Sequence, residues 1–427
     1  MAVPKIRFPG FTEDWEQRKV DDITSSYSGG TPQAGNQDYY NGDIPFIRSG
    51  EIYQSHTELF ITQKGLNNSS AKMVSKGDIL YALYGATSGE VSRSKLDGAI
   101  NQAILAIHPK DDFNADFLVE WFRKEKDNII SRYLQGGQGN LSAQIIKNLD
   151  VMIPSSSEQK MIGDFFSNLN NLITLHQRKL ESMKLLKKSL LQKMFPKSGE
   201  TVPEVRFPGF TDAWEQRKFA ELANIRRGLT YKPNDVTDSG IRVLRSSNIN
   251  EDSFIENDDD VFVKESAVNI SSVKDGDILI TSANGSNRLV GKHAIISKAG
   301  QAVHGGFMLI ASAYGNPYFL NASMSSSWYT NFVNMYVAGG NGAIGNLKKS
   351  DLENQVIRVP SEAEQLRIGQ FFQSLDQTIT LHQRAPNDAQ SRLPIQTGGA
   401  IFTKQGYCLL SSGFNSLRIS SLNSLLI

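Results

Sequence analysis

The sequence predicts an α+β protein of two similar domains, each followed by a long helix, because the chain contains the same framework twice. Residues 6–19, IRFPGFTEDWEQRK, return as residues 205–218, VRFPGFTDAWEQRK. Residues 163–178 and 369–384 form a second matching pair, and both end in LHQR. This repeat is far longer than a solenoid unit, so each copy is predicted to be a domain with its own core. The interiors between these segments differ, which indicates one scaffold that makes two different contacts.

The composition is that of an ordinary soluble chain. It has 427 residues, a formal net charge of +1 and one cysteine. A nearly neutral chain can present a nucleic-acid surface only as a local basic patch. The single Cys408 cannot form an internal disulfide, and neither a signal-peptide core nor an apolar run of membrane-spanning length is present. A cytoplasmic location without membrane contact is therefore expected.

Strand and helix patterns alternate within the first copy. Turn residues at 28–32 precede a short predicted strand at 43–48, and the Gly-Asp turn at 77–78 leads into another at 79–84. The second copy repeats this turn and strand at 276–281. A third strand is predicted over the apolar residues 100–107. A helix follows at about 115–134, then a glycine-rich loop, and then a strand at 149–154.

Residues 157–196 are predicted to form one long amphipathic helix, which Pro196 ends. Its apolar seam, which His176 and Lys179 interrupt, consists of Ile162, Phe165, Leu169, Leu172, Met183, Leu186 and Leu190. Such a helix needs a partner, and the predicted partner is its own repeat, which starts near Ser361. The histidines of the two LHQR segments are expected to be seam residues rather than metal ligands. The lysines of the first helix are expected to form a solvated face.

These features together resemble the specificity subunit of type I restriction-modification systems, over residues 1 to about 384. The resemblance implies that each domain is a target recognition domain that reads one half of a bipartite, asymmetric DNA site. It also implies that the two long helices pack antiparallel, set the spacer between the half-sites and dock methyltransferase subunits. The implied partners are double-stranded DNA, methyltransferase subunits and restriction subunits. S-adenosylmethionine, ATP and Mg²⁺ are then expected on those partner subunits and not on this chain.

The resemblance also places the domain boundaries. The target recognition domains are expected at 1–157 and 204–360, the first spacer helix at 158–195 and a linker at 196–203. The second spacer helix is expected to stop at residue 384, because the heptad is lost there and Pro386 lacks a backbone donor. Residues 385–427 are interpreted as an aberrant, frameshifted and disordered tail that weakens docking of one methyltransferase subunit.

The candidate DNA contacts are polar side chains on loops that follow matching strands of the two copies. Arginine suits guanine, and asparagine or glutamine suits adenine. The candidates in the first copy are Arg48, Ser49, Tyr84, Thr87, Ser88, Gln135, Gln138 and Asn140. Those in the second are Arg245, Ser246, Asn284, Asn287, Arg288, Asn341 and Asn346. The alternative is that these segments are ordinary solvated or glycine-rich turns.

Two motifs mimic catalytic sites. Residues 316–319, NPYF, resemble the loop of adenine methyltransferases but lack its second proline, and Asn316 is better interpreted as a helix N-cap. Asp150 with residues 158–160, EQK, mimics a nuclease site, but the second copy lacks the lysine. The chain is therefore expected to be non-catalytic. A self-contained DNA methyltransferase or nuclease, and a coiled-coil scaffold without a DNA role, are the alternatives.

Overall fold

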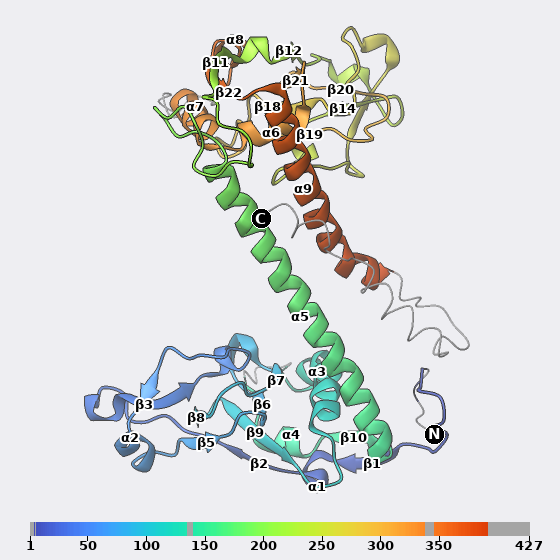
Figure 1. Cartoon of the computed structure of the whole chain (residues 1–427). Helices are drawn as coiled ribbons and strands as arrows, with labels where there is room; N and C mark the ends of the chain where they lie inside the picture. Colours follow the sequence, from blue (N-terminus) through green and yellow to red (C-terminus); the bar gives the residue numbers. More distant parts are fainter. Residues whose placement is uncertain (1–3, 5, 135–139, 338–345, 392–427) are drawn as a thin grey trace. The chain divides into compact units, whose positions relative to one another are not determined.

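The computed structural model describes residue 4 and residues 6–134, 140–337 and 346–391, and two compact units divide the chain between Thr174 and Leu175 (Figure 1). The boundary lies inside a single helix, α5 (Ser156–Lys193). Both units combine small sheets with helices that follow them in sequence, so the predicted α+β class is confirmed. No helix in the described part of the chain is long and apolar enough to cross a membrane.

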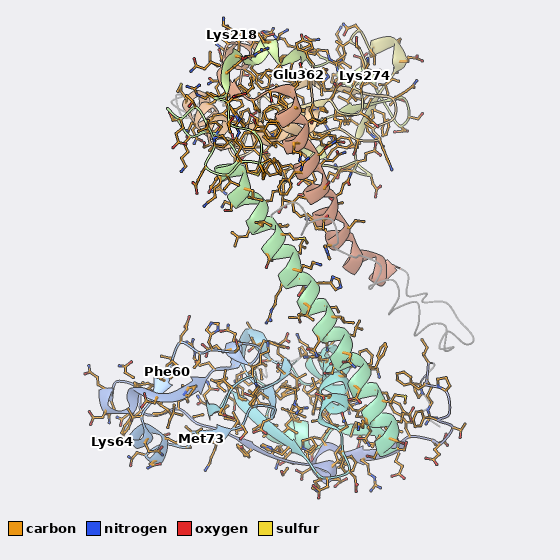
Figure 2. All side chains as sticks on the ribbon, in the orientation of Figure 1. Phe60, Lys64, Met73, Lys218, Lys274 and Glu362 are labelled. Carbon is orange, nitrogen blue, oxygen red and sulfur yellow. The ribbon has the colours of Figure 1, made fainter. Side chains whose placement is uncertain are left out.

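The first unit contains two four-stranded sheets and a two-stranded ribbon. One sheet has the order β2 (Thr24–Ser28), β9 (Ile104–Pro109), β6 (Ile79–Ala82), β7 (Val91–Arg93). The other has the order β4 (Phe60–Ile61), β3 (Tyr40–Ile47), β8 (Gly98–Ile100), β5 (Lys72–Val74). The ribbon pairs β1 (Glu16–Lys19) with β10 (Asp150–Ile153). The helices are α1 (Val20–Ile23), α2 (Gln63–Asn67), α3 (Ala115–Tyr133) and α4 (Ala143–Lys147). Figure 2 marks the end of this unit formed by β4, α2 and β5 with Phe60, Lys64 and Met73.

The second unit repeats the first of these sheets and the ribbon at the start of the long helix, whereas its other sheet has a different strand order. Its sheets have the orders β12 (Ala223–Arg227), β21 (Met308–Ala313), β18 (Ile278–Thr281), β19 (His293–Ile295) and β13 (Val236–Thr237), β17 (Val261–Val263), β14 (Ile241–Leu244), β20 (Ala302–His304). Two ribbons pair β11 (Glu215–Lys218) with β22 (Val356–Val359) and β15 (Ile249–Asn250) with β16 (Ser253–Phe254). The helices are α6 (Pro317–Met324), α7 (Ser327–Val337), α8 (Lys349–Glu353) and α9 (Glu362–Ser391). Each unit has one parallel pair among its described strands. This pair is β3 with β8 in the first unit and β14 with β20 in the second.

The predicted strands and helix of the first copy are present, with one exception. The apolar residues 100–107 form two strands rather than one, because a turn at 101–103 separates β8 from β9. In that turn the Asn101 side chain accepts a hydrogen bond from the Ala103 backbone, which stabilises the change of direction. Strands β6 and β18 lie between two neighbours in their sheets and are buried at every residue, which explains their unbroken apolar sequences.

The repeated RFPGF opening anchors each unit to the start of its long helix. The Nε and Nη2 atoms of Arg7 each donate to one oxygen of the Glu158 carboxylate at 2.7 Å. The same atoms of Arg206 donate to the Glu364 carboxylate, also at 2.7 Å. The next residue packs edge-on against a helix phenylalanine, with ring centroids 5.8 Å apart in Phe8–Phe165 and in Phe207–Phe371. A paired, bidentate geometry is what a buried carboxylate requires. The opening is thus a structural clamp.

Within the second unit the end of α5 runs antiparallel to α9, as the resemblance implies. His176 Nδ1 lies 3.3 Å from His382 Nδ1, and just beyond the end of α5 the ring of Phe195 lies 6.2 Å from that of Phe372. Between these contacts the Lys187 amine lies 2.6 Å from the Asp376 carboxylate and also pairs with Asp252. The prediction of a fully solvated lysine face is therefore wrong at Lys187. Burial opposes its charge, but the two carboxylates outweigh that effect and raise its pKa.

The apolar seam predicted for α5 is exposed at Leu169, Leu172 and Leu186, whereas the corresponding stripe of α9 is packed. In α9, Phe372, Leu375 and Ile379 are only 2%, 2% and 8% exposed. Their counterparts in α5, Phe166, Leu169 and Ile173, are 38%, 37% and 42% exposed, and Leu172 of the predicted seam is exposed as well. The buried residues at the end of α5 and just beyond it cover this part of α9. They are Leu191, Met194 and Phe195. Residues at the corresponding place after α9 lie outside the described part of the chain.

The second long helix does not end at Arg384. It continues to Ser391, and it therefore passes through Pro386. Proline removes one backbone donor, but the residues after it can still donate to carbonyls one turn earlier, so a helix near its end survives. The boundary predicted at residue 384 is wrong by one to two turns. The predicted disordered tail covers residues 385–427, but residues 385–391 belong to α9, so this part of the prediction is wrong. Residues 392–427 lie outside the described residues.

Candidate nucleic-acid interface

Three polar loops of the second unit converge at one edge of its sheets. The loop after β14 carries Ser246, the loop after β18 carries Asn284, and the loop before α8 carries Asn346. The Asn284 side chain donates to the Ser246 hydroxyl at 3.0 Å. Asn346 forms a β-bridge with Ala283, beside a 2.8 Å hydrogen bond from the Leu347 amide to the Ser282 carbonyl. The sequence prediction that these loops share an edge is consistent with this geometry.

The two candidate arginines of this edge differ in availability. Arg245 is half-buried, and its Nη2 donates to the Asp259 carbonyl at 3.3 Å. Arg288 is exposed on the loop after β18, and it has no ion-pair partner among the described residues. Asn287 beside it is also exposed. Arg288 is thus the guanidinium best placed to bind an external acceptor, whereas Asn341 lies outside the described residues.

The first unit has the same arrangement of loops. The Leu141 amide donates to the Leu83 carbonyl at 3.0 Å, which matches the Leu347–Ser282 bond of the second unit. This contact places Asn140, which is exposed, beside the loop that starts at Tyr84. Gln135 and Gln138 belong to the same loop but lie outside the described residues. Corresponding backbone contacts therefore hold different side chains at the two edges.

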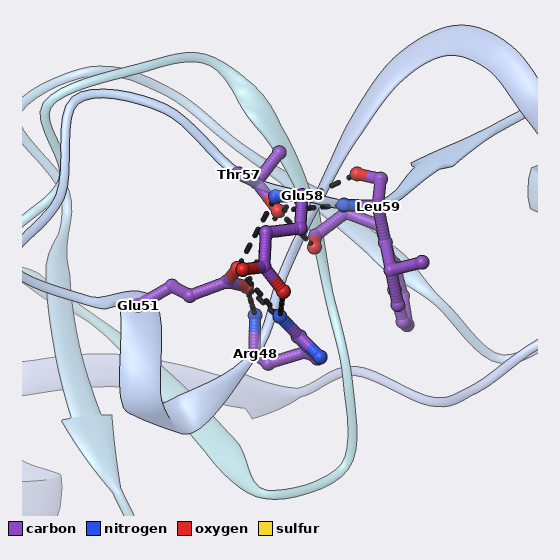
Figure 3. Close-up of polar contacts among 6 residues, drawn as sticks. Arg48, Glu51, Thr57, Glu58 and Leu59 are labelled. Carbon is purple, nitrogen blue, oxygen red and sulfur yellow. Dashed lines mark hydrogen bonds and ion pairs between the residues drawn. The ribbon is translucent and has the colours of Figure 1, made fainter.

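Arg48 of the first edge is already occupied by carboxylates (Figure 3). Its guanidinium donates to Glu51 at 2.8 Å and 3.1 Å and to Glu58 at 2.7 Å. Burial of Glu51 opposes ionisation, but hydrogen bonds from the Arg48 side chain and from the backbone amides of Arg48 and Glu58 lower its pKa to about 2. Hydrogen bonds to both carboxylates raise the pKa of Arg48. A nucleobase would have to displace Glu58, the more exposed of the two, to reach Arg48.

The remaining candidates of the first copy lie in the loop after β6. Ser88 is buried, and its hydroxyl donates to the Gly85 carbonyl at 2.9 Å, so this candidate shapes the loop and does not face outward. Tyr84 is half-buried, and part of its ring packs on the core of the unit. Ser49 and Thr87 are half-buried as well. Short polar side chains often satisfy their own loop, and the sequence does not distinguish that role from ligand binding.

One exposed aromatic residue at the second edge was not among the candidates predicted from the sequence. Phe307 is 74% exposed in the turn between β20 and β21. Its carbonyl accepts hydrogen bonds from the amides of Ser282 and Ala283, so it lies against the candidate loop after β18. The available signal was the interruption of an apolar strand sequence by Gly305 and Gly306.

The two catalytic mimics have structural roles. The Asn316 side chain accepts a hydrogen bond from the Phe319 amide at 2.9 Å and caps α6, as the N-cap interpretation predicts. Glu158 is fully buried under Arg7, so it does not face a substrate. Among the described residues no three histidine, cysteine or acidic side chains gather as a group that could hold a metal ion.

Comparison with known proteins matches both copies of the framework. The family model for the type I restriction modification DNA specificity domain matches residues 12–185 and 211–390. The type I restriction enzyme MjaVIII specificity subunit of Methanocaldococcus jannaschii is 23% identical over 243 residues, which cover 56% of each chain. The MjaIX specificity subunit of the same organism is 29% identical over 43% of this chain and 44% of that relative. The chain thus spans about half the length of these two relatives.

Two further matches extend over most of the chain. The type I restriction enzyme EcoKI specificity subunit of Escherichia coli K12 is 22% identical over 89% of this chain and 86% of the relative. The crystal structure of the type I restriction-modification system S subunit from M. genitalium has the same fold, with a TM-score of 0.59 at 13% identity over 91% of this chain and 96% of that chain. Because the family model covers most of both copies, the protein belongs to the type I restriction-modification DNA specificity family.

Proposed function

We propose that this chain is the DNA-specificity subunit of a type I restriction-modification enzyme and has no catalytic activity of its own. Each unit reads one half of a bipartite, asymmetric duplex site through the edge described above. The long helices set the spacer and dock the methyltransferase subunits, which assemble with restriction subunits in the cytoplasm. Those partners supply the sites for S-adenosylmethionine, ATP and Mg²⁺.

One observation carries this proposal. The two units share one four-stranded sheet, β2-β9-β6-β7 or β12-β21-β18-β19, and the same clamp. The loops at their edges carry different side chains: Arg48 and Asn140 in one unit, and Asn284, Arg288 and Asn346 in the other. Base edges in the major groove are distinguished by such donors and acceptors. A repeated scaffold with different readers suits a target whose two halves have different sequences.

Binding and catalysis should separate in a purified system. The chain together with its methyltransferase subunits should retain one DNA sequence selectively at 150 mM salt and methylate it. The chain alone should transfer no methyl group and cut no DNA when S-adenosylmethionine or Mg²⁺ is added. Methyl transfer or cleavage by the chain alone supports the alternative of a self-contained enzyme. Absence of selective binding in the complete complex supports the scaffold alternative.

The spacer is tested by lengthening α5. An insertion of four residues after Lys179 adds about one turn, or roughly 6 Å. This position lies between two contacts of α5 with α9, at His176 and at Lys187, so one of these contacts has to re-form one turn away. In an active complex the methylated motif should keep both half-sites and gain spacer length. An unchanged spacer would contradict the role assigned to the helix.

A further inference from the structure

Phe307 is an exposed aromatic residue on a fixed turn. An exposed apolar side chain alone is ordinary on a protein surface. The backbone around Phe307 is held at several points, however. Its carbonyl accepts from Ser282 at 2.9 Å and from Ala283 at 3.1 Å, and the Gly305 amide donates to Leu244 at 2.9 Å. A ring presented by a fixed backbone loses little conformational freedom when it binds a ligand.

Close backbone contact fixes the same turn from the opposite side. A Cβ atom on Gly228 would lie 1.9 Å from the Gly305 carbonyl oxygen, so only glycine permits the two segments to approach in this way. Leu229 forms a bridge with Gly305. The sequence therefore uses a glycine on the neighbouring strand to seat the turn that carries Phe307.

The neighbours of this turn are polar candidates for base recognition. The Arg245 side chain approaches the position of a Gly305 Cβ to 3.9 Å, and the hydrogen bonds to Ser282 and Ala283 connect the turn to the loop that carries Asn284 and Arg288. Guanidinium and amide groups form paired hydrogen bonds to guanine and adenine in the major groove. The complementary apolar feature in that groove is the C5-methyl group of thymine.

The first unit has this turn without the ring. Its Leu83 amide donates to the Ala103 carbonyl at 2.8 Å, as Ser282 donates to Phe307, so Ala103 occupies the corresponding place. Ala103 is 8% exposed. The backbone position is thus common to both units, and at this position an apolar group projects from the second unit but not from the first.

We propose that Phe307 determines specificity in the second half-site, where its ring packs against the C5-methyl group of a thymine in the major groove. This inference rests on the proposed DNA-binding function. A wedge between base steps is the other known use of phenylalanine in DNA binding, and it is typical of minor-groove proteins that kink the duplex. Guanidinium and amide groups such as those of Arg288 and Asn284 can form paired hydrogen bonds to guanine and adenine in the major groove, which supports binding there.

The experiment compares thymine with uracil, which differs only by the methyl group. The complete complex with methyltransferase subunits is measured on duplexes in which each thymine of the second half-site is replaced in turn. With the natural chain, one replacement should weaken binding about fourfold, the factor for one CH₂-sized apolar contact. Phe307→Ala should weaken binding to the thymine duplex by at least that factor and abolish the difference between thymine and uracil. Phe307→Leu should retain part of the difference.

Several outcomes overturn the inference. A second half-site without thymine would overturn it, and so would an equal preference for thymine over uracil in the natural chain and in Phe307→Ala. A Phe307-dependent increase of 2-aminopurine fluorescence at one base step would show that the ring instead inserts between bases as a wedge. Melting temperatures of the variants control for folding. Selectivity at the first half-site should remain in every variant, and its absence in the natural chain would refute the proposed function instead.

Discussion

His176 and His382, which occupy the same position in the two copies of the framework, lie with their Nδ1 atoms 3.3 Å apart. Two residues that meet their own counterparts lie on the axis that relates the two helix segments carrying them, as in a symmetric dimer interface. The helix pair of the second unit therefore has a local pseudo-twofold axis at these histidines. Burial lowers the pKa of His382, and the nearby charges of Lys179 and His176 lower it further. The ring is therefore neutral near pH 7.

Loss of the clamp should destabilise a unit. Arg206→Met leaves the carboxylate of Glu364, which is only 1% exposed, without its partner, and should lower the free energy of unfolding of the second unit by about 3 kcal/mol. Thermal melting measures the change. Arg217→Met is the matched control, because its ion pair with Glu215 is exposed and should cost under about 1 kcal/mol. Equal effects of the two replacements would show that the clamp is not a stabilising contact.

Acid should weaken the second unit through His304. This ring is fully buried and hydrogen-bonded to the Arg226 carbonyl at 3.2 Å, and burial lowers its pKa to about 4. The unfolded chain binds this proton near pH 6.5, so the contribution to stability is complete above that pH and is lost as the pH falls toward 4, by about 3 kcal/mol. Melting curves of the natural chain and His304→Leu, recorded from pH 7.5 to 4.5, should show a smaller slope in the variant. Identical slopes would contradict this assignment.

Removing a carboxylate from the first edge should strengthen DNA binding. Glu58→Gln removes one negative charge beside Arg48 while Glu51 still holds the guanidinium. Affinity at low salt should rise about two- to threefold, and the loss of affinity with added salt should become steeper, because one more cation is available to phosphate. Fluorescence anisotropy across a salt series measures both. Glu181→Gln on α5 is the control and should change neither; weaker binding by Glu58→Gln would argue against this edge.

A complete second helix should stabilise the chain. Replacing residues 385–427 with a copy of residues 179–196 supplies a second set of Leu, Met and Phe for the uncovered stripe at Phe166, Leu169 and Ile173. Burial of this stripe should add about 2 kcal/mol and raise the melting temperature. The number of methyltransferase subunits bound should rise as well.

The matched control for this graft carries serine at the copies of Leu191, Met194 and Phe195. It should melt at the temperature of the natural chain. If the natural chain already binds two methyltransferase subunits as tightly as the repaired chain, the tail is no defect.

Repetition and periodicity predicted two α+β units and the long helices, because repeated segments indicate duplication and an apolar period indicates a helix. The apolar period did not indicate which part of the seam is buried, since Leu169, Leu172 and Leu186 are exposed. The clamp between Arg7 and Glu158 could not be predicted, since the two residues are brought together only by the fold. The same holds for the edges. The sequence identified loops at matching strand ends, but not that Ser88 turns inward, that Arg48 is held by carboxylates or that Phe307 projects. Those outcomes depend on backbone direction and on neighbours distant in sequence.

Methylome sequencing of cells that carry this chain and its methyltransferase subunits is the decisive test of the proposed function. One bipartite, asymmetric methylated motif is expected. Asn140→Ala should relax selectivity only at one half and Asn346→Ala only at the other, by roughly 1–3 kcal/mol for each lost base contact. A motif that loses both halves through one of these replacements, or no methylated motif that depends on the chain, would contradict the proposed function.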